Sequence, residues 1–236
     1  MSITFNKKQQ QVINELNQNI LLSAGAGTGK TNVLSYRVAN ILNKNRANAD
    51  EILCLTFTNK ACRELKNRIT SQLDFETANK ITIRTIHGFA YQVITTTAKK
   101  AQTIFKEFVI FDDEDQKTLI RQTIANFPKA RALDIQYIVN CIEQLKQERA
   151  LKHIYTEDIE ADYTTIYHQH LKFNKTFNQQ QSDNLTKFFQ FDGLNIIINY
   201  ELALQQMHGL DYKDLIANAY RLRSEEHTSE LQSLAY

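Results

Sequence analysis

A glycine-rich segment near the N-terminus constrains the fold of this chain more than any other feature. The segment Ala24-Gly25-Ala26-Gly27-Thr28-Gly29-Lys30-Thr31 satisfies the pattern G/A-x-x-x-x-G-K-[ST], and the apolar run Ile20 to Ser23 precedes it. Apolar residues then recur at helical spacing, namely Leu34, Val38, Ile41 and Leu42. A strand, a glycine turn and a helix in this order predict an α/β domain with a parallel sheet.

The same segment has the composition of a phosphate-binding loop. Glycines let the backbone curl so that successive N–H groups point at phosphate oxygens, and the following helix adds the positive end of its dipole. Lys30 is expected to reach the β- and γ-phosphates, and the Thr31 hydroxyl is expected to bind Mg²⁺. The loop alone predicts a bound nucleoside triphosphate, which kinases, GTPases, transporters and helicases all share.

The rest of the first hundred residues continues the alternation of strands and helices. Ile52 to Phe57 and Ile81 to Ile83 are apolar, β-branched runs that predict two more strands. Helical patterns follow each of them, the first marked by Ala61, Cys62, Leu65, Ile69 and Leu73 and the second by Phe89 and Val93. We therefore expect a parallel sheet with helices on both faces.

A change of pattern near residue 105 predicts a second region. Residues 112–204 carry mostly helical spacing, and the lone proline, Pro128, lies between two of the expected helices. The Asn/Gln-rich stretch from Thr176 to Asn184 predicts a loop. The expected organisation is an ATP-binding part over residues 1–105, a helical subdomain over 106–204, a return to the first domain over 205–222, and a tail over 223–236.

Composition excludes several classes of protein. The hydrophobic fraction of 42% predicts a folded chain. The 28 Lys and Arg residues nearly balance 26 Asp and Glu residues, so any basic nucleic-acid surface must be local. Three dispersed cysteines favour a reducing compartment. Residues 1–10 do not resemble a signal peptide, and no apolar run approaches the roughly 20 residues that span a bilayer. We expect a cytoplasmic protein without a membrane partner.

The segment from Leu55 to Leu65 predicts a nucleic-acid contact. It lies at a strand-to-helix junction, on the sheet edge where ligands of open α/β sheets gather. Phe57 offers a flat face on which a base can stack, although a core aromatic at a strand end is the alternative for this residue alone. Thr58, Asn59 and the N–H groups of the new helix can hold a phosphate. Positive charge is supplied nearby by Lys60, Arg63, Lys66 and Arg68.

Taken in order, these segments resemble the UvrD/Rep/PcrA family of superfamily 1 DNA helicases. Residues 5–10, FNKKQQ, are similar to the family's adenine-reading glutamine motif, which implies that Gln9 reads adenine. Residues 55–65, LTFTNKACREL, resemble helicase motif Ia. Residues 85–89, TIHGF, resemble the motif T-x-H-S-F, which implies that Thr85 and His87 contact single-stranded DNA. Gly88 replaces the family's serine and removes one hydroxyl donor.

The resemblance covers residues 5–222 and implies a RecA-like P-loop sheet with an inserted helical subdomain. Residues 108–115 are similar to the entry into subdomain 1B, and residues 210–216 resemble the segment L-D-F-D-D-L-L that returns to domain 1A, with Lys213 departing from the pattern. This last segment is expected to be mainly structural. ATP and Mg²⁺ are the implied cofactors, and Arg37 joins the loop and Gln9 in the expected nucleotide-binding set. Lys30 and Thr31 are the expected catalytic residues.

Two parts of the family pattern are not found in the sequence. The D-E-x-Q-D motif, whose acids hold Mg²⁺ and activate water, does not follow residues 210–216, and the second RecA-like domain with its arginines is also missing. Asp112 to Asp115 open a helical pattern, where acids favour the N-terminus, and do not replace the motif. We expect this chain to bind ATP weakly at most, without hydrolysis or unwinding. The resemblance implies 3′→5′ movement on single-stranded DNA, including duplex junctions, for the full-length protein.

Several alternatives stay open. An AddA/RecB-type helicase–nuclease subunit shares these motifs, and a small P-loop kinase would lack the segment Thr-Phe-Thr-Asn-Lys-Ala. A non-catalytic module that binds ATP or single-stranded DNA is the alternative from another class. Residues 223–233, RSEEHTSELQS, resemble the in-frame translation of a sequencing-library adapter, and a polar natural tail is the other interpretation.

Overall fold

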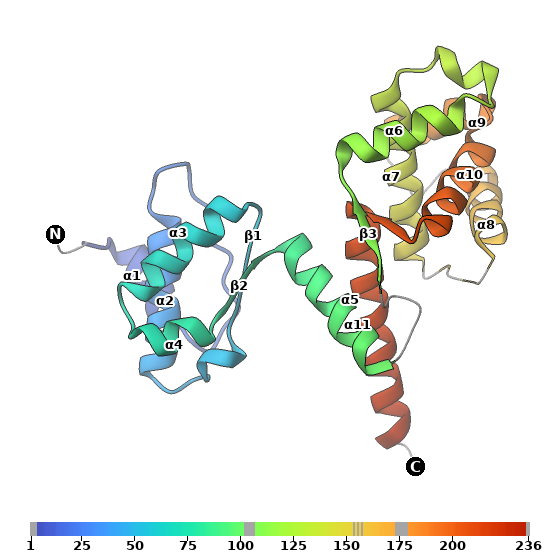
Figure 1. The fold of residues 1–236 in the computed structure, drawn as a ribbon. Coiled ribbons are helices and arrows are strands. Elements are labelled where there is room, and N and C mark those ends of the chain that lie inside the picture. Colours follow the sequence, from blue (N-terminus) through green and yellow to red (C-terminus); the bar gives the residue numbers. More distant parts are fainter. Residues whose placement is uncertain are drawn as a thin grey trace. The chain divides into compact units, whose positions relative to one another are not determined.

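The computed structural model describes residues 4–101, 107–152, 154, 156, 158–172 and 179–234. The chain is an α/β protein with mostly helices and two small parallel sheets. It divides into two compact units, Met1–Phe89 (unit 1) and Ala90–Tyr236 (unit 2), each described below by itself (Figure 1). None of the helices in the described part of the chain is long and apolar enough to cross a membrane.

The described part of unit 1 contains helices and one pair of strands. In chain order its elements are α1 (Lys7–Asn14), α2 (Lys30–Asn43), the 3₁₀ turn η1 (Ala49–Glu51), β1 (Leu53–Thr56), α3 (Asn59–Thr70), α4 (Phe75–Lys80), β2 (Thr82–Thr85) and the start of α5 (Ile86–Ala101). Strands β1 and β2 are parallel, with Leu53 opposite Thr82 and Thr56 opposite Thr85. Both strands lie where the sequence predicted them.

The core of unit 1 lies on one face of this strand pair. Because side chains alternate along a strand, Cys54 of β1 faces inward against Leu65 and Ile69 of α3. On the other face, Leu53 and Leu55 are 42% and 43% exposed. Figure 1 shows α1 to α4 on one side of β1 and β2. The expected cover on both faces is therefore not found among the described residues.

The strand predicted over Ile20 to Ser23 is not formed. The segment has no regular secondary structure, no ladder joins it to β1 or β2 within the described residues, and Leu21 is 95% exposed. Apolar composition indicates that a segment suits a strand, whereas a strand exists only when its N–H and C=O groups have a neighbour. The prediction was wrong because periodicity does not report whether that neighbour is present.

Unit 2 is mostly helical, and its described residues include one pair of strands. After the rest of α5, its elements are β3 (Val109–Phe111), α6 (Asp113–Ile124), the 3₁₀ turn η3 (Pro128–Ala132), α7 (Ile135–Leu151), α8 (Ile159–Lys172), α9 (Gln179–Gln190), α10 (Gly193–Gln206), β4 (Gly209–Asp211) and α11 (Tyr212–Leu234). Strands β3 and β4 are parallel, with Val109 opposite Gly209. The mostly helical region predicted from residue 112 to 204 is confirmed.

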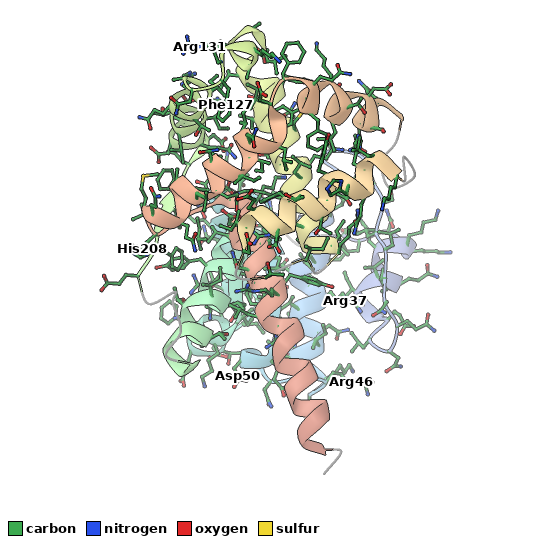
Figure 2. All side chains as sticks on the ribbon, turned by 90° about the vertical axis from the view of Figure 1, so that its right-hand side faces the viewer. Arg37, Arg46, Asp50, Phe127, Arg131 and His208 are labelled. Carbon is green, nitrogen blue, oxygen red and sulfur yellow. The ribbon has the colours of Figure 1, made fainter. Side chains whose placement is uncertain are left out.

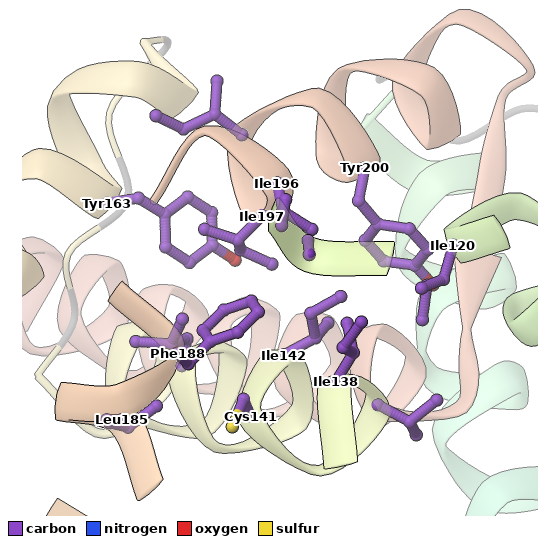
Figure 3. Close-up of a cluster of buried hydrophobic side chains, with 14 of the residues drawn as sticks. Ile120, Ile138, Cys141, Ile142, Tyr163, Leu185, Phe188, Ile196, Ile197 and Tyr200 are labelled. Carbon is purple, nitrogen blue, oxygen red and sulfur yellow. The ribbon is translucent and has the colours of Figure 1, made fainter. Parts of the chain in front are cut away.

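Helix α7 lies at the centre of the main core of unit 2. Its buried residues Ile138, Ile142 and Leu145 recur every three or four positions, which puts them on one helical face. Figure 3 shows this face meeting aromatic and branched side chains from α8, α9 and α10, including Tyr163 and Phe188. Burial of large apolar side chains, at about 1.5–3 kcal/mol each, makes this cluster the main stabilising feature of the unit.

A buried ionic cluster lies beside that core. The Lys146 ammonium, on a side chain only 3% exposed, contacts Asp211 at 2.6 Å, Glu201 at 2.7 Å and Asp214 at 2.8 Å. Arg149 adds a second cation, 2.6 Å from Asp162. The segment from residue 210 to 216 is thus structural, as the sequence indicated, since Asp211 also accepts hydrogen bonds from the backbone N–H groups that begin α11.

The electrostatics of the cluster are set by burial and by the excess of acids around Lys146. Burial raises the pKa of the Asp214 carboxyl to about 8, with Asp211 and Glu201 adding to the rise against the opposing effect of Lys146. Burial also disfavours ionisation of Asp211, but the adjacent ammonium keeps the pKa of that carboxyl below its ordinary value. Lys146 itself has its pKa raised well above the ordinary value because the nearby carboxylates outweigh its desolvation.

Two other predictions for this unit have different outcomes. Pro128 begins η3 between α6 and α7, as expected, near Phe127 and Arg131 (Figure 2). The loop expected over residues 176–184 is wrong from Gln179 onward, because α9 begins there; residues 176–178 lie outside the described residues. Leu185 and Phe188, both fully buried, hold this polar helix against the core, so tertiary packing overrides the local composition.

The acidic run before α6 and the end of the chain complete the fold. Asp112 is the N-cap of α6, where its carboxylate accepts from the N–H groups of Glu114 and Asp115, so this run has the helix-capping role inferred from the sequence. The backbone of α11 continues to Leu234. The adapter origin of the tail and the domain boundaries stay predictions.

Candidate nucleotide and single-strand site

The glycine-rich loop lies directly before α2. Gly27 and Gly29 have φ values of 74° and 85°, in the left-handed region where residues with a Cβ are strained, and Gly29 is the N-cap of α2. Helix α2 then begins at Lys30, so the loop ends against the helix N-terminus, as the sequence predicted. This geometry explains why glycine is needed at two of the predicted phosphate-binding positions.

Lys30 and Thr28 make the polar contacts of the loop with itself. The Lys30 ammonium donates to the carbonyl oxygens of Ala24 at 2.7 Å and Gly25 at 2.5 Å. The Thr28 hydroxyl donates to the Gly25 carbonyl at 2.9 Å. Thr31 is exposed in the first turn of α2, adjacent to Lys30. The structure thus brings the two residues predicted as catalytic to the same end of one helix.

Gln9 contacts this loop from α1. Its side-chain oxygen accepts from the Asn6 N–H at 2.9 Å, and Asn6 in turn caps the Gln9 N–H, which forms a capping box. The Gln9 amide nitrogen donates to the Thr28 carbonyl at 3.0 Å. The residue predicted to read adenine therefore contacts the glycine-rich loop, although nineteen positions separate Gln9 from Thr28 in sequence.

Arg37 is not brought to the loop by the contacts of its side chain. The half-buried guanidinium donates to the carbonyl oxygens of Val12, at 2.5 Å, and Glu15, at the end of α1. Asn40, one turn further along α2, donates to the Ile13 carbonyl at 2.9 Å. Arg37 (labelled in Figure 2) thus anchors α1 against α2. Its assignment to nucleotide binding stays a prediction.

The residues predicted to contact DNA gather at one edge of the strand pair. Because β1 and β2 are parallel and Thr56 lies opposite Thr85, the segments that follow both strands emerge at the same edge. Phe57 is 89% exposed there and is not part of the core of unit 1. Thr58 is the N-cap of α3, with its hydroxyl accepting from the Ala61 N–H at 3.1 Å, and Asn59 and Lys60 are exposed in the first turn.

The segment after β2 supplies the other half of this edge. The Thr85 hydroxyl accepts from the Gly88 N–H at 3.0 Å, and the half-buried His87 lies between them in sequence. A Cβ at position 88 would lie 3.0 Å from the Thr85 hydroxyl oxygen, so the family's serine would require a small shift here. Gly88 therefore suits the local packing as well as lacking a hydroxyl donor.

Only part of the expected positive charge is available at this edge. Lys60 and Arg63 are exposed at the start of α3. Lys66 instead donates to the Ala78 carbonyl at 2.6 Å, and Arg68 pairs with Glu64 one turn earlier. The sequence could not distinguish these roles, because all four residues lie on one short helix and differ only in what faces them.

Sequence reasoning missed Asn6 and Asn40 as residues that position the site. The signal for Asn6 was present, since an asparagine three residues before Gln9 fits a capping box. Asn40 carried no signal, because its partner is a backbone carbonyl on another helix. No group of three or more His, Cys, Asp or Glu side chains that could hold a metal occurs in the described ranges. Thr31 thus remains the only predicted Mg²⁺ ligand.

Fold and site together define an α/β protein in which a glycine-rich loop begins a helix and an exposed aromatic side chain stands at a parallel sheet edge. Its sequence matches the model of the UvrD/REP helicase N-terminal domain over residues 5–234. The chain belongs to this family.

Curated relatives agree with this assignment. The ATP-dependent DNA helicase PcrA of Leuconostoc citreum is 27% identical over 218 residues, which cover 89% of this chain and 29% of the relative. The protein of the same name from Staphylococcus aureus is 27% identical over 230 residues, 92% of this chain and 30% of the relative. A probable DNA helicase II homolog from Mycoplasma pneumoniae is 27% identical over 96% of this chain and 29% of its own length. The chain spans about three tenths of the length of these relatives.

Proposed function

We propose that this chain is the ATP-binding and single-strand-binding part of an ATP-driven DNA helicase. The observation that carries the proposal is the parallel register of β1 and β2, which sets Phe57 and the start of α3 beside Thr85 in the same unit as the glycine loop. Membership of the helicase family and the names of the relatives support it. In this proposal, unit 1 is part of a RecA-like sheet and unit 2 carries the inserted helical subdomain.

The chemistry at the loop follows from the contacts of Lys30. Its ammonium donates to two loop carbonyls, and phosphate oxygens of ATP are stronger acceptors because they are charged. We therefore expect Lys30 to exchange the carbonyls for the β- and γ-phosphates. Thr31 is exposed beside it and can give one oxygen to Mg²⁺, with nucleotide phosphates as further ligands, as is usual for this ion.

The chemistry at the sheet edge is stacking and phosphate binding. Phe57 presents its ring to solvent, where a base of any sequence can stack on it for about 1–3 kcal/mol. Asn59 and Lys60 lie at the N-terminus of α3, where N–H groups and positive charge favour a phosphate. Single-stranded DNA, with duplex junctions in the full-length protein, is the proposed partner. A cytoplasmic location and 3′→5′ movement belong to the same proposal.

ATP hydrolysis and unwinding are not expected of this chain by itself. An acid that activates the attacking water, and a second domain that closes on ATP, are needed for turnover. Among the described residues, no Asp or Glu side chain forms an ion pair or hydrogen bond with Lys30, whose ammonium contacts the carbonyls of Ala24 and Gly25. We expect the 236-residue chain to bind ATP and single-stranded DNA without hydrolysis or unwinding.

A binding experiment with Lys30→Met tests the nucleotide site. Loss of one charge-assisted partner, worth about 1.5–3 kcal/mol, predicts a fall in Mg·ATP affinity of about tenfold to a hundredfold, measured with a fluorescent ATP analogue. Lys44→Met, at the other end of α2, is the matched control and should bind as the wild type does. Equal affinity for wild type and Lys30→Met would show that the loop does not bind phosphate in the proposed way.

A turnover assay separates the two parts of the proposal. Phosphate release above background from the purified chain would contradict the expected inactivity while leaving the binding site in place. Salt-dependent binding of a thymidine oligonucleotide in the absence of ATP affinity would instead favour the non-catalytic DNA-binding module.

A further inference from the structure

We propose that Gln9 positions the phosphate loop itself, in addition to the adenine contact expected of it. The proposal rests on the proposed nucleotide site. It assigns Gln9 and its capping partner Asn6 as positioning residues that act on triphosphate binding even when the ligand has no base. The juxtaposition that carries it is the hydrogen bond from the Gln9 amide to the Thr28 carbonyl, at 3.0 Å.

The orientation of the Gln9 side chain is fixed by the capping box. Its oxygen accepts from the Asn6 N–H at 2.9 Å, and the Asn6 side chain accepts from the Gln9 N–H at the same distance. With the oxygen held on the Asn6 side, the amide nitrogen faces the loop. The contact with Thr28 is thus made by a side chain that has already lost most of its rotational freedom, which lowers the entropic cost of holding the loop.

The helix that carries Gln9 is itself anchored. Arg37 and Asn40 of α2 donate to backbone carbonyls of Val12, Ile13 and Glu15 at the C-terminal end of α1. Just before α1, the ring of Phe5 packs edge-on against Tyr36 of α2, with 4.7 Å between ring centroids. Since α2 is the helix that follows the loop, Gln9 connects the loop to a pair of helices that contact each other.

The point of attachment is where the loop has the most freedom to lose. Thr28 lies between Gly27 and Gly29, the two loop residues with positive φ. Glycine has the widest range of backbone conformations. A hydrogen bond to Thr28, which has a glycine on each side, therefore restricts the chain strongly. In a trans peptide the C=O and the next N–H point in opposite directions, so holding the Thr28 carbonyl toward α1 also turns the Gly29 N–H away from α1. Gln9 therefore sets the direction of a predicted phosphate donor.

Both roles of Gln9 are compatible in hydrogen-bond terms. A glutamine amide has two N–H donors and an oxygen with two lone pairs. The bonds to Thr28 and Asn6 use one of each, and the remaining donor and acceptor can still meet an adenine edge. A base-free ligand is therefore needed to separate the two roles.

The test compares inorganic tripolyphosphate with ATP, each with Mg²⁺, in wild type, Gln9→Met and Gln10→Met. Gln10 is a matched control because its amide also donates to a backbone carbonyl, that of Phe5 at 3.0 Å, but does not contact the loop. Loss of a single hydrogen bond predicts that Gln9→Met weakens tripolyphosphate binding by about threefold to tenfold, with Gln10→Met unchanged. If Gln9→Met lowers ATP affinity and leaves tripolyphosphate affinity unchanged, Gln9 acts through the base alone and the proposal is wrong.

A second measurement does not depend on ligand binding. The chain has 6 glycines, so the amide signals of Gly25, Gly27 and Gly29 can be followed by nitrogen-15 relaxation. We expect lower order parameters for Gly27 and Gly29 in Gln9→Met than in wild type or Gln10→Met. Unchanged order parameters would overturn the positioning role. If wild type binds neither ligand, the proposed nucleotide site fails, while the relaxation data still decide whether Gln9 holds the loop.

Discussion

Unit 1 exposes several of its predicted site residues, whereas unit 2 buries an ionic cluster and large aromatic side chains. Phe57 of unit 1 is 89% exposed, and Thr58 and Lys60, which are close to it in sequence, are exposed as well. Lys30, at the end of the glycine-rich loop, is also exposed. In unit 2, Lys146 and Asp211 are almost fully buried beside a large apolar core. Residues of similar chemistry are thus exposed at the predicted sites of unit 1 and buried in a structural ionic cluster in unit 2.

The largest effect is expected from Lys146→Met in unit 2. Removing the ammonium leaves Asp211, Asp214 and Glu201 buried without their common cation, and breaking a buried pair in this way costs about 3–5 kcal/mol. Hydrogen exchange measured by mass spectrometry should show faster exchange throughout α7 and α10. Lys117→Met, which removes an exposed pair with Glu114, should leave exchange unchanged. Similar behaviour of both variants would remove the contrast between the two units.

Phe57→Ala in unit 1 should have a large effect on binding and none on folding. Loss of a stacking surface worth about 1–3 kcal/mol predicts a fall of about fivefold to a hundredfold in affinity for a thymidine oligonucleotide, measured by fluorescence anisotropy. Because the ring is exposed, the thermal midpoint should not change. Phe75→Ala is the control, since Phe75 is also exposed but begins α4. An unchanged oligonucleotide affinity would show that the sheet edge does not bind bases.

Thr58→Ala tests a structural and a binding role together, because Thr58 caps α3 and is also a predicted phosphate contact. Loss of an N-cap costs about 1 kcal/mol, so exchange in α3 should become faster by about fivefold. Thr58→Ala should also weaken DNA binding, because the hydroxyl is a predicted phosphate contact. Thr58→Ser keeps the hydroxyl and should retain both the cap and the DNA affinity. Should the serine variant exchange as fast as the alanine variant, the hydroxyl would not be the cause.

The stability of unit 2 should also depend on pH. Asp214 has a pKa of about 8 in the folded protein, raised from an ordinary value of 3.8 by burial, so the folded state holds its proton where the unfolded state has lost it. Its contribution to stability is therefore complete below about pH 4 and is lost as pH rises to about 8. We expect Asp214→Asn to lose less stability than wild type between pH 5 and pH 8 (roughly the span of this titration), measured by urea unfolding.

The difference between wild type and Asp214→Asn isolates this group. The buried His170, whose pKa burial lowers, titrates in both proteins, so its effect cancels. Asp211 has the opposite sign, since its lowered pKa gives stability that is lost only at more acidic pH. Parallel stability curves for the two proteins would show that Asp214 is ionised in the folded state.

Features with a local sequence signal could be predicted, whereas features that depend on a distant partner could not. The loop, both strands of unit 1 and the edge that carries Phe57 were predicted because their signals are local, namely glycines, β-branched runs and a strand-to-helix junction. The strand over Ile20 to Ser23 and the loop over 176–184 were mispredicted because each depends on a partner elsewhere in the chain. The ionic cluster at Lys146 was not predicted, since its partner Asp211 lies 65 positions away.

Candidate site residues show the same limit. The sequence could not show that Phe57 is exposed, because an aromatic residue at the end of a strand is often buried. Nor could it show that Arg37 contacts α1, because its partner is a backbone carbonyl. The capping box at Asn6 was readable, but its extension to Thr28 was not, because that contact joins two segments through a backbone carbonyl.

The ionic cluster at Lys146 also decides where the gene can be cut for expression. A recombinant piece limited to residues 106–204 would keep Lys146 and Glu201 but lose Asp211 and Asp214, and β3 would lose β4 as its neighbour. Such a piece would carry a buried cation that has lost the Asp211 carboxylate and the contact with Asp214. A stable recombinant helical subdomain must therefore extend past Asp214 into α11, even though the change in sequence pattern suggests an earlier boundary.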